Sequence, residues 1–305
     1  MRYYLSYSQN MGRGLSSKNK GNLMRKLSIL SMIVFLLSLM MGHSISFAQS
    51  KSLEMKWKLE GFDRPESLHT SSDHSEIYVS NVNGDSRAKD GNGYISRVSL
   101  TGEIIEKDWI TGLNGPKGFT VKGNTLYIAD IDELVMVDIN SKKIIKRVAF
   151  QDAGFLNDVN IVGDKVFISD TGKDTLLVYT EENGVEVFLS GEDVKAPNGL
   201  LPQDGKLLVT RMRTGELLSI DIETKNIDVV GNGIISGDGI GILEDGSYII
   251  TSFTREIYHI KSMTETDQLL DSKPEKISQN DAYYFGGHLY VANMGNASIT
   301  AWKVN

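Results

Sequence analysis

The sequence predicts an all-β domain made of six repeats, and three observations support this prediction. The first is a short segment of alternating apolar and small residues that recurs six times, as in 77–81 and 127–130. One β-branched residue marks each copy: Val79, Ile128, Ile168, Val209, Ile250 and Val291. The intervals between these residues are 49, 40, 41, 41 and 41, a period that indicates a propeller or a solenoid.

The second observation is a further apolar strand after each marked segment. We expect these strands at residues 94–100, 134–139, 176–179, 217–220, 257–260 and 299–304. A Gly or Asp turn and a third strand usually come next, and Pro is almost absent from the strands. Short strands separated by turns in this way predict four-stranded antiparallel blades.

The third observation concerns the two ends of the repeat region. The last repeat stops after its third strand, 298–304, whereas an unpaired strand, 53–59, precedes the first repeat. If strand 53–59 completes the last blade, the ring closes and the exposed edges are paired. We therefore predict a six-bladed β-propeller closed by the N-terminal strand of the mature chain. The longer first interval contains a polar insertion, 84–93, which we interpret as a surface loop because its spacing does not fit a calcium loop.

The first 48 residues have the features of a targeting segment. They carry six basic residues, no acidic one, and an apolar run at 27–42 that is short for a membrane span. Ser46-Phe47-Ala48 ends the segment with small residues where a signal peptide is cut. We predict cleavage between Ala48 and Gln49, giving a leader, 1–48, a propeller, 49–305, and export to a periplasm or the medium. An uncleaved membrane anchor is the alternative interpretation.

The composition narrows the possible partners and chemistry. The net charge is −7, and loss of the six leader charges makes it −13, which argues against nucleic acid. The absence of Cys excludes disulfides, thiolate metal sites and Cys catalysis. The chain has no Gly-x-Ser-x-Gly elbow, phosphate-binding loop or dinucleotide fingerprint. We expect a monomer that binds a small molecule and is not stably inserted in a membrane after cleavage.

A polar residue stands 11 to 13 positions before the marked residue of every repeat. These six are Glu66, Lys117, Asn157, Asn198, Asp238 and Asn280. In a propeller the innermost strand starts at the channel mouth, so the six side chains would converge on the axis. Two carboxylates with several amide oxygens suit calcium, with zinc, magnesium or manganese as alternatives. Asn198-Gly199 and Asp238-Gly239 are also dipeptides that favour tight turns, so each is open to a purely structural interpretation.

Several of these segments resemble one known family of six-bladed propellers, the senescence marker protein, gluconolactonase and luciferin-regenerating enzyme group. The resemblance is carried by Pro65-Glu66, Asn157-Asp158, Pro197-Asn198-Gly199 and Gly237-Asp238-Gly239. It implies one divalent metal ion held by Glu66, Asn198 and Asp238. It also implies catalysis by Asp238 and Asn157, with Asp158 and Asp281 as alternative proton acceptors. Asn157, Lys117, Arg211 and Asn280 are the expected substrate contacts, and a position on the surface is the alternative for Arg211.

Two departures weaken the likeness to sugar lactonases. Phe155 stands where family members often have an Arg, and Lys117 brings a positive charge to the ring, where it would compete with a metal unless it turns to solvent. The resemblance implies a metal-dependent hydrolase of lactones or related esters. The alternatives are a non-catalytic, extracytoplasmic binding propeller and a calcium ion that only stabilises the ring.

Overall fold

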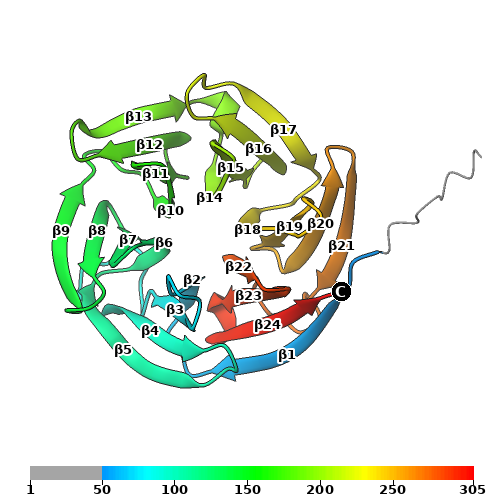
Figure 1. The fold of residues 1–305 in the computed structure, drawn as a ribbon, viewed down its shortest axis with the longest axis horizontal. Coiled ribbons are helices and arrows are strands. Elements are labelled where there is room, and N and C mark those ends of the chain that lie inside the picture. The colour runs from blue at the N-terminus through cyan, green and yellow to red at the C-terminus, as the bar shows by residue number, and fades with distance from the viewer. Residues whose placement is uncertain (1–49) are drawn as a thin grey trace, which may run out of the picture. The chain divides into compact units, whose positions relative to one another are not determined.

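A computed structural model describes residues 50–305, and residues 51–305 form one compact unit. The described residues form six four-stranded antiparallel sheets arranged as the blades of a ring (Figure 1). The predictions of a leader and of its cleavage fall on residues 1–49, outside the described residues. Within residues 50–305, no helix combines the length and apolar character needed to cross a membrane.

The first three blades follow one another along the chain, each running from the axis outward. Blade 1 consists of β2 (Pro65–Thr70), β3 (Glu76–Asn81), β4 (Gly93–Ser99) and β5 (Ile104–Leu113). Blade 2 consists of β6 (Pro116–Lys122), β7 (Thr125–Asp130), β8 (Glu133–Asp138) and β9 (Lys143–Ala149). Blade 3 consists of β10 (Leu156–Val162), β11 (Lys165–Asp170), β12 (Thr175–Thr180) and β13 (Gly184–Ser190).

The last three blades include the closure of the ring. Blade 4 consists of β14 (Pro197–Gln203), β15 (Lys206–Arg211), β16 (Glu216–Asp221) and β17 (Ile227–Asn232). Blade 5 consists of β18 (Gly237–Ile242), β19 (Tyr248–Ser252), β20 (Glu256–Ser262) and β21 (Glu265–Asp271). Blade 6 consists of β22 (Ala282–Phe285), β23 (His288–Asn293), β24 (Ser298–Val304) and β1 (Leu53–Glu60). Two 3-10 turns, Glu192–Val194 and Met294–Asn296, lie between strands.

Strand β1 closes the ring as the sequence predicted. It pairs antiparallel with β24, from Leu53 opposite Val304 to Glu60 opposite Ser298. Because the first and last segments of the domain share one sheet, the blade can form only when both ends of the chain come together. The prediction of a six-bladed propeller closed by its N-terminal strand is confirmed.

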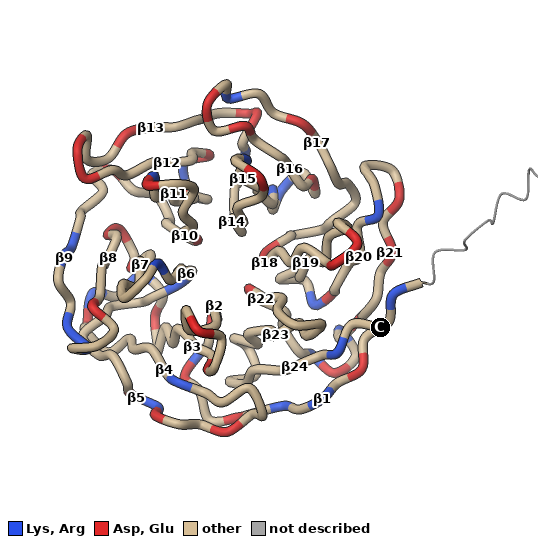
Figure 2. The backbone as a smooth tube through the Cα atoms, in the orientation of Figure 1, with Lys and Arg blue, Asp and Glu red and all other residues tan. Residues whose placement is uncertain are grey.

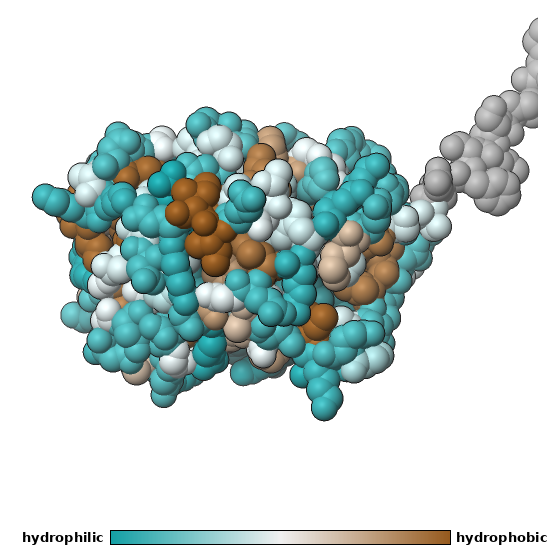
Figure 3. All heavy atoms as spheres, turned by 90° about the horizontal axis from the view of Figure 1, so that it is seen from below, coloured by the Kyte–Doolittle hydropathy of each residue, from teal (hydrophilic) through white to brown (hydrophobic). Residues whose placement is uncertain are grey.

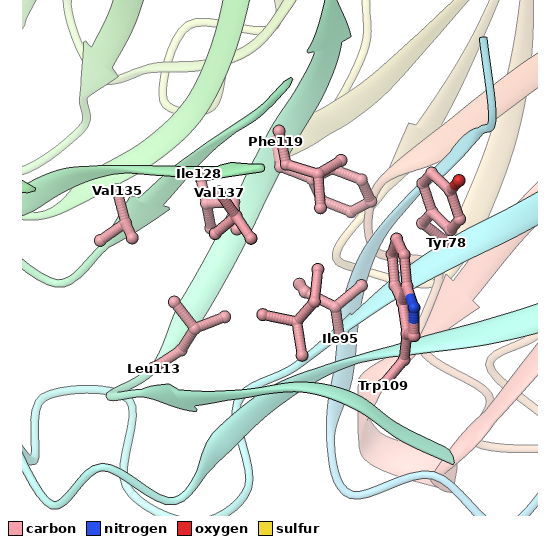
Figure 4. Packing of buried hydrophobic residues seen from close by; sticks show 10 residues of the cluster. Tyr78, Ile95, Trp109, Leu113, Phe119, Ile128, Val135 and Val137 are labelled. Carbon is pink, nitrogen blue, oxygen red and sulfur yellow. The ribbon is translucent and has the colours of Figure 1, made fainter. Parts of the chain in front are cut away.

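The hydrophobic core lies between neighbouring blades. One cluster joins Ile95 and Trp109 of blade 1 to Phe119 and Ile128 of blade 2 (Figure 4), and five similar clusters complete the ring. The six marked residues of the repeat are all fully buried, since each blade is covered on both faces. Burying a Val or Ile side chain contributes about 1.5–3 kcal/mol, so the repeated segment is where the sequence stabilises the stack of blades.

Charged residues concentrate on the outer strands and connecting loops, and a few lie on the inner strands around the axis (Figure 2). On the side of the disc formed by β1 and β5, the surface is mostly hydrophilic with a small apolar patch (Figure 3). Exposed apolar residues of these two strands are Met55, Ile104 and Ile105. The charged residues of the inner strands are therefore separate from those of the outer surface, and they lie around the axis of the ring.

Candidate functional site in the central channel

Irregular strand pairing directs the ring residues of blades 1 to 5 toward the axis. In each of these blades, the pairing between the innermost strand and its neighbour shifts at the ring residue. Such a shift leaves a backbone N–H without a strand partner, and this donor must bond elsewhere when buried. A hydroxyl of the second strand accepts it in four blades, for example from Gly199 N to Thr210 Oγ1 at 2.8 Å and from Gly239 N to Thr251 Oγ1 at 2.9 Å.

The glycines after three ring residues allow the inner strands to approach closely. A Cβ atom on Gly118 would lie 2.1 Å from Asp158 Oδ1, and one on Gly199 would lie 2.0 Å from the Asp238 carbonyl oxygen. Gly199 and Gly239 lie within strands β14 and β18. The tight-turn interpretation of Asn198-Gly199 and Asp238-Gly239 is therefore wrong. These glycines lie in strands, and they allow neighbouring blades to contact each other closely.

The structure brings all six ring residues together around one cavity of about 240 Å³. All six are buried, including Glu66 and Asp238, each 5% exposed. The rest of the lining consists of Arg64, Ser86, Phe155, Thr171, Met212, Phe253 and Met294. A larger groove of about 620 Å³ lies along β9, β12 and β13, but its lining contains none of the unpartnered buried polar atoms found among residues 50–305.

Three polar atoms of the ring are buried without a hydrogen-bond partner among the described residues. They are Glu66 Oε2, Asn198 Oδ1 and Lys117 Nζ. The Asn198 Nδ2 donates to the Gly237 carbonyl over 3.4 Å. Buried polar atoms are rarely left unpaired, so these atoms are candidates for contact with an ion, water or ligand.

The donors of the ring fit a hard cation better than a soft one. Residues 50–305 contain no group of three or more His, Cys, Asp and Glu side chains placed to hold a metal ion. The available set is instead two carboxylates, from Glu66 and Asp238, with the amide oxygen of Asn198. Oxygen donors of this kind suit calcium, magnesium or manganese.

Burial and mutual repulsion make the carboxylates of the channel reluctant to ionise. Burial raises the pKa of Glu66 and of Asp238 well above the usual range, and nearby carboxylates, Asp238 for Glu66 and Asp281 for both, raise them further. Burial lowers the pKa of Lys117, and the neighbouring Glu66 carboxylate partly opposes this effect. The ring thus holds opposite charges in an environment that disfavours both, and a bound cation would stabilise the ionised carboxylates.

Asp158 and Asp281, the alternative proton acceptors, lie outside the 240 Å³ cavity. The Asp158 carboxylate accepts N–H bonds from Val159 at 2.7 Å and from Leu200 of the next blade at 2.6 Å. The Asp281 carboxylate accepts from the Ala282 N–H at 2.7 Å and from the Ser67 hydroxyl of blade 1. Both carboxylates therefore link neighbouring blades, with their oxygens already engaged.

Three of the four expected substrate contacts line the cavity. Asn157 and Asn280 line the cavity, where Asn157 Nδ2 donates to Thr171 Oγ1 over 3.4 Å and Asn280 Oδ1 accepts from Met294 N over 3.2 Å. Lys117 points inward, 2% exposed, with Nζ 4.4 Å from the centre of the Phe155 ring. The possibility that it turns to solvent is wrong.

Arg211 does not line the cavity, contrary to its expected role as a substrate contact. Its guanidinium bonds Glu216 Oε2 and the Glu192 carbonyl oxygen, each over 2.5 Å, because β15 directs this side chain along its own blade. The next residue, Met212, lines the cavity instead.

Sequence reasoning missed the apolar part of the lining and the role of the insertion. Met212, Phe253 and Met294 each come two residues after the small residue of the repeat, so a fixed offset from the repeat could have found them. The insertion, 84–93, is a loop as predicted but not merely a solvated one. Its Ser86 lines the cavity, and its Arg87 donates to the Gly154 carbonyl over 3.3 Å.

The fold and the ring together define a propeller with a polar axial cavity. No protein-family model and no curated protein matches the chain, so the family resemblance of the sequence stays a prediction. Virginiamycin B lyase from Staphylococcus aureus is 11% identical, with a TM-score of 0.62 over 83% of this chain and 99% of that chain. A candidate gluconolactonase is 14% identical, with a TM-score of 0.59 over 85% of this chain and 94% of that chain.

Another similar structure comes from a protein complex. A chain in the nidogen/laminin complex is 14% identical, with a TM-score of 0.59 over 69% of this chain and 86% of that chain. At these identities the likeness shows the fold alone. Proteins with this fold include enzymes, so the function of this chain must be argued from its own cavity.

Proposed function

We propose that the protein is a divalent-metal-dependent hydrolase of lactones or related esters, with metal and substrate in the central cavity. The observation that carries this proposal is the pair of unpartnered buried oxygens, Glu66 Oε2 and Asn198 Oδ1, beside the Asp238 carboxylate. Buried carboxylate and amide oxygens that lack a hydrogen-bond donor are suited to holding a hard cation. Glu66, Asn198 and Asp238 would be the protein ligands.

The residues of the ring have different roles in the proposed hydrolysis. A bound divalent ion supplies Lewis acidity toward a carbonyl oxygen. Asp238 is the group that accepts a proton from the attacking water, since its carboxylate lines the same cavity as the Glu66 and Asn198 oxygens. The amide groups of Asn157 and Asn280 orient the substrate, and the buried walls exclude bulk water from the reacting ester.

The test combines ion binding with two ring variants. Calorimetry of the purified, EDTA-treated protein with Ca²⁺, Mg²⁺, Mn²⁺ and Zn²⁺ is expected to show one site. Glu66→Gln and Asp238→Asn are expected to weaken binding at least a hundredfold, whereas Glu186→Gln, an exposed carboxylate on β13, leaves it unchanged. Metal-dependent cleavage in a panel of lactones and aryl esters would complete the support.

Two results would count against the hydrolase. If the wild-type protein binds no divalent ion, or if both ring variants bind as well as wild type, the proposed metal site is wrong. If the ion binds but no lactone or ester is cleaved, the same site belongs to a binding propeller or holds a structural cation. A binding propeller is favoured by one observation, the apolar lining beside the ring at Met212, Phe253 and Met294.

A further inference from the structure

The ammonium of Lys117 is the starting point, because it has no hydrogen-bond acceptor or carboxylate partner in the described part of the chain and only the Phe155 ring beside it. Its Nζ is buried, has no hydrogen-bond partner among residues 50–305, and faces the cavity. Glu66 attracts it but lies beyond ion-pair contact, since no carboxylate of the described residues is within 4.0 Å of this nitrogen. A buried cation without a partner is costly, so its position in a cavity points to an anionic group of a ligand.

Two further cations lie near the cavity without a carboxylate partner in the described structure. Arg64 lines the cavity, with its guanidinium bonded to the Gly84 carbonyl over 2.5 Å and to the sulfur of Met294 over 3.5 Å. Arg87, from the insertion, lies over the Phe155 ring at 4.8 Å. In a protein with a net charge of −7, unpaired cations gathered around one cavity would attract an anion.

Most of the remaining lining is apolar, with Ser86 and Thr171 as its uncharged polar members, and this limits the body of the ligand. Phe155, Met212, Phe253 and Met294 come from blades 3, 4, 5 and 6, so apolar side chains surround the ring on most of its circumference. Phe253 is 50% exposed, which is unusual for a Phe and leaves one face available to a ligand. A sugar would leave its hydroxyls unpaired against these walls, whereas an apolar group would bury surface on them.

We propose that the channel takes an organic monoanion with an apolar body, its carboxylate bound by Lys117 and its body against Phe155, Met212, Phe253 and Met294. The inference rests on the proposed function, since the substrate of the same cavity would be an ester or lactone that also carries a carboxylate and an apolar body. The cavity of about 240 Å³ limits the enclosed part of the ligand to a small group.

The test compares three probes by calorimetry, each in CaCl₂ and again in EDTA. 3-Phenylpropanoate carries both features, 3-phenylpropanamide has the same shape without the charge, and gluconate has the charge without the apolar body. The proposal expects 3-phenylpropanoate to bind at least tenfold more tightly than either of the others.

Two variants assign the preference to residues. Lys117→Gln is expected to remove the preference for the acid over the amide, whereas Lys122→Gln, which removes an exposed charge from the same strand, keeps it. Phe253→Ser is expected to lower the affinity for 3-phenylpropanoate about tenfold and to leave gluconate unchanged. Val187→Ser, at an exposed apolar residue of β13, is the matched control. Thermal melting of each variant establishes that it is folded.

The proposal is overturned if the amide or gluconate binds as tightly as 3-phenylpropanoate, if Lys117→Gln keeps the acid preference, or if no probe binds. These outcomes are distinct from failure of the hydrolase. Loss of the metal site with a retained, Lys117-dependent preference for the acid leaves the inference standing while the hydrolase falls. If the protein is a metal-dependent esterase but binds the acid and the amide equally, the hydrolase stands and the inference falls.

Discussion

Replacement of Thr210 by Val tests whether the repeated hydroxyl positions the ring. Thr210 Oγ1 accepts the Gly199 N–H over 2.8 Å and donates to the Asp238 carbonyl oxygen over 3.0 Å. One hydroxyl thus connects the backbones that carry two proposed metal ligands, Asn198 and Asp238, on adjacent blades. Valine has the same shape but neither hydrogen-bonding group.

The expected cost follows from the two backbone groups that lose their partner. Each buried N–H or C=O left unsatisfied costs about 1–3 kcal/mol, and the added methyl group offsets about 0.8 kcal/mol. We expect Thr210→Val to lower the free energy of unfolding by about 1–5 kcal/mol, which lowers Tm by roughly 2–20 °C in a domain of this size. Urea unfolding and thermal melting, both in EDTA, measure the change.

The same variant is expected to weaken Ca²⁺ binding about tenfold or more, because the two ligand strands are no longer held in register. Thr264→Val, at an exposed threonine in the turn before β21, serves as the control for loss of a hydroxyl. If Thr210→Val unfolds like wild type within 0.5 kcal/mol, about the scatter of surface substitutions, and also binds Ca²⁺ as tightly as wild type, the reasoning is refuted. Full stability with reduced Ca²⁺ affinity would contradict only the stability argument.

Three other predictions concern charge and close packing around the axis. Lys117→Met is expected to tighten Ca²⁺ binding about tenfold in calorimetry, since it removes a like charge from the ring; weaker binding would show that Lys117 supports the cation instead. Burial raises the pKa of Asp281 from 3.8 to about 6, so the folded state binds more protons than the unfolded state across that window, and stability falls as pH rises through it. Asp281→Asn is therefore expected to raise the free energy of unfolding by up to about 3 kcal/mol relative to wild type at pH 7 in EDTA, and to raise it little at pH 4. Urea unfolding at both pH values measures this difference, and equal effects at the two pH values would contradict the prediction. Gly118→Ala places a Cβ 2.1 Å from Asp158 Oδ1 and is expected to lower the free energy of unfolding by about 2–3 kcal/mol. Gly115→Ala is the control, because its Cβ would have its nearest neighbour at 3.5 Å. Equal melting temperatures of the two variants would contradict the prediction.

The ring shows how far a repeat pattern can predict a site. Its six members were found from their offset to a buried β-branched residue, because that residue must pack between blades in every repeat. The offset reports position along the strand, and a ring of blades converts equal positions into one cavity. The same offset says nothing about contacts between blades, so Asn198-Gly199 and Asp238-Gly239 were open to interpretation as turns until their strands were placed.

Sequence by itself determined the number of blades, the closing strand and the membership of the ring, because burial between blades imposes one residue pattern on every repeat. Tertiary structure alone decided which side chains meet across blades. Arg211 turned to Glu216, Lys117 turned inward over Phe155, and the insertion brought Arg87 to blade 3. The physical reason is that side-chain pairing depends on distances between neighbouring strands and blades, such as the 67 residues that separate Arg87 from Gly154, and local pattern and periodicity do not encode these distances.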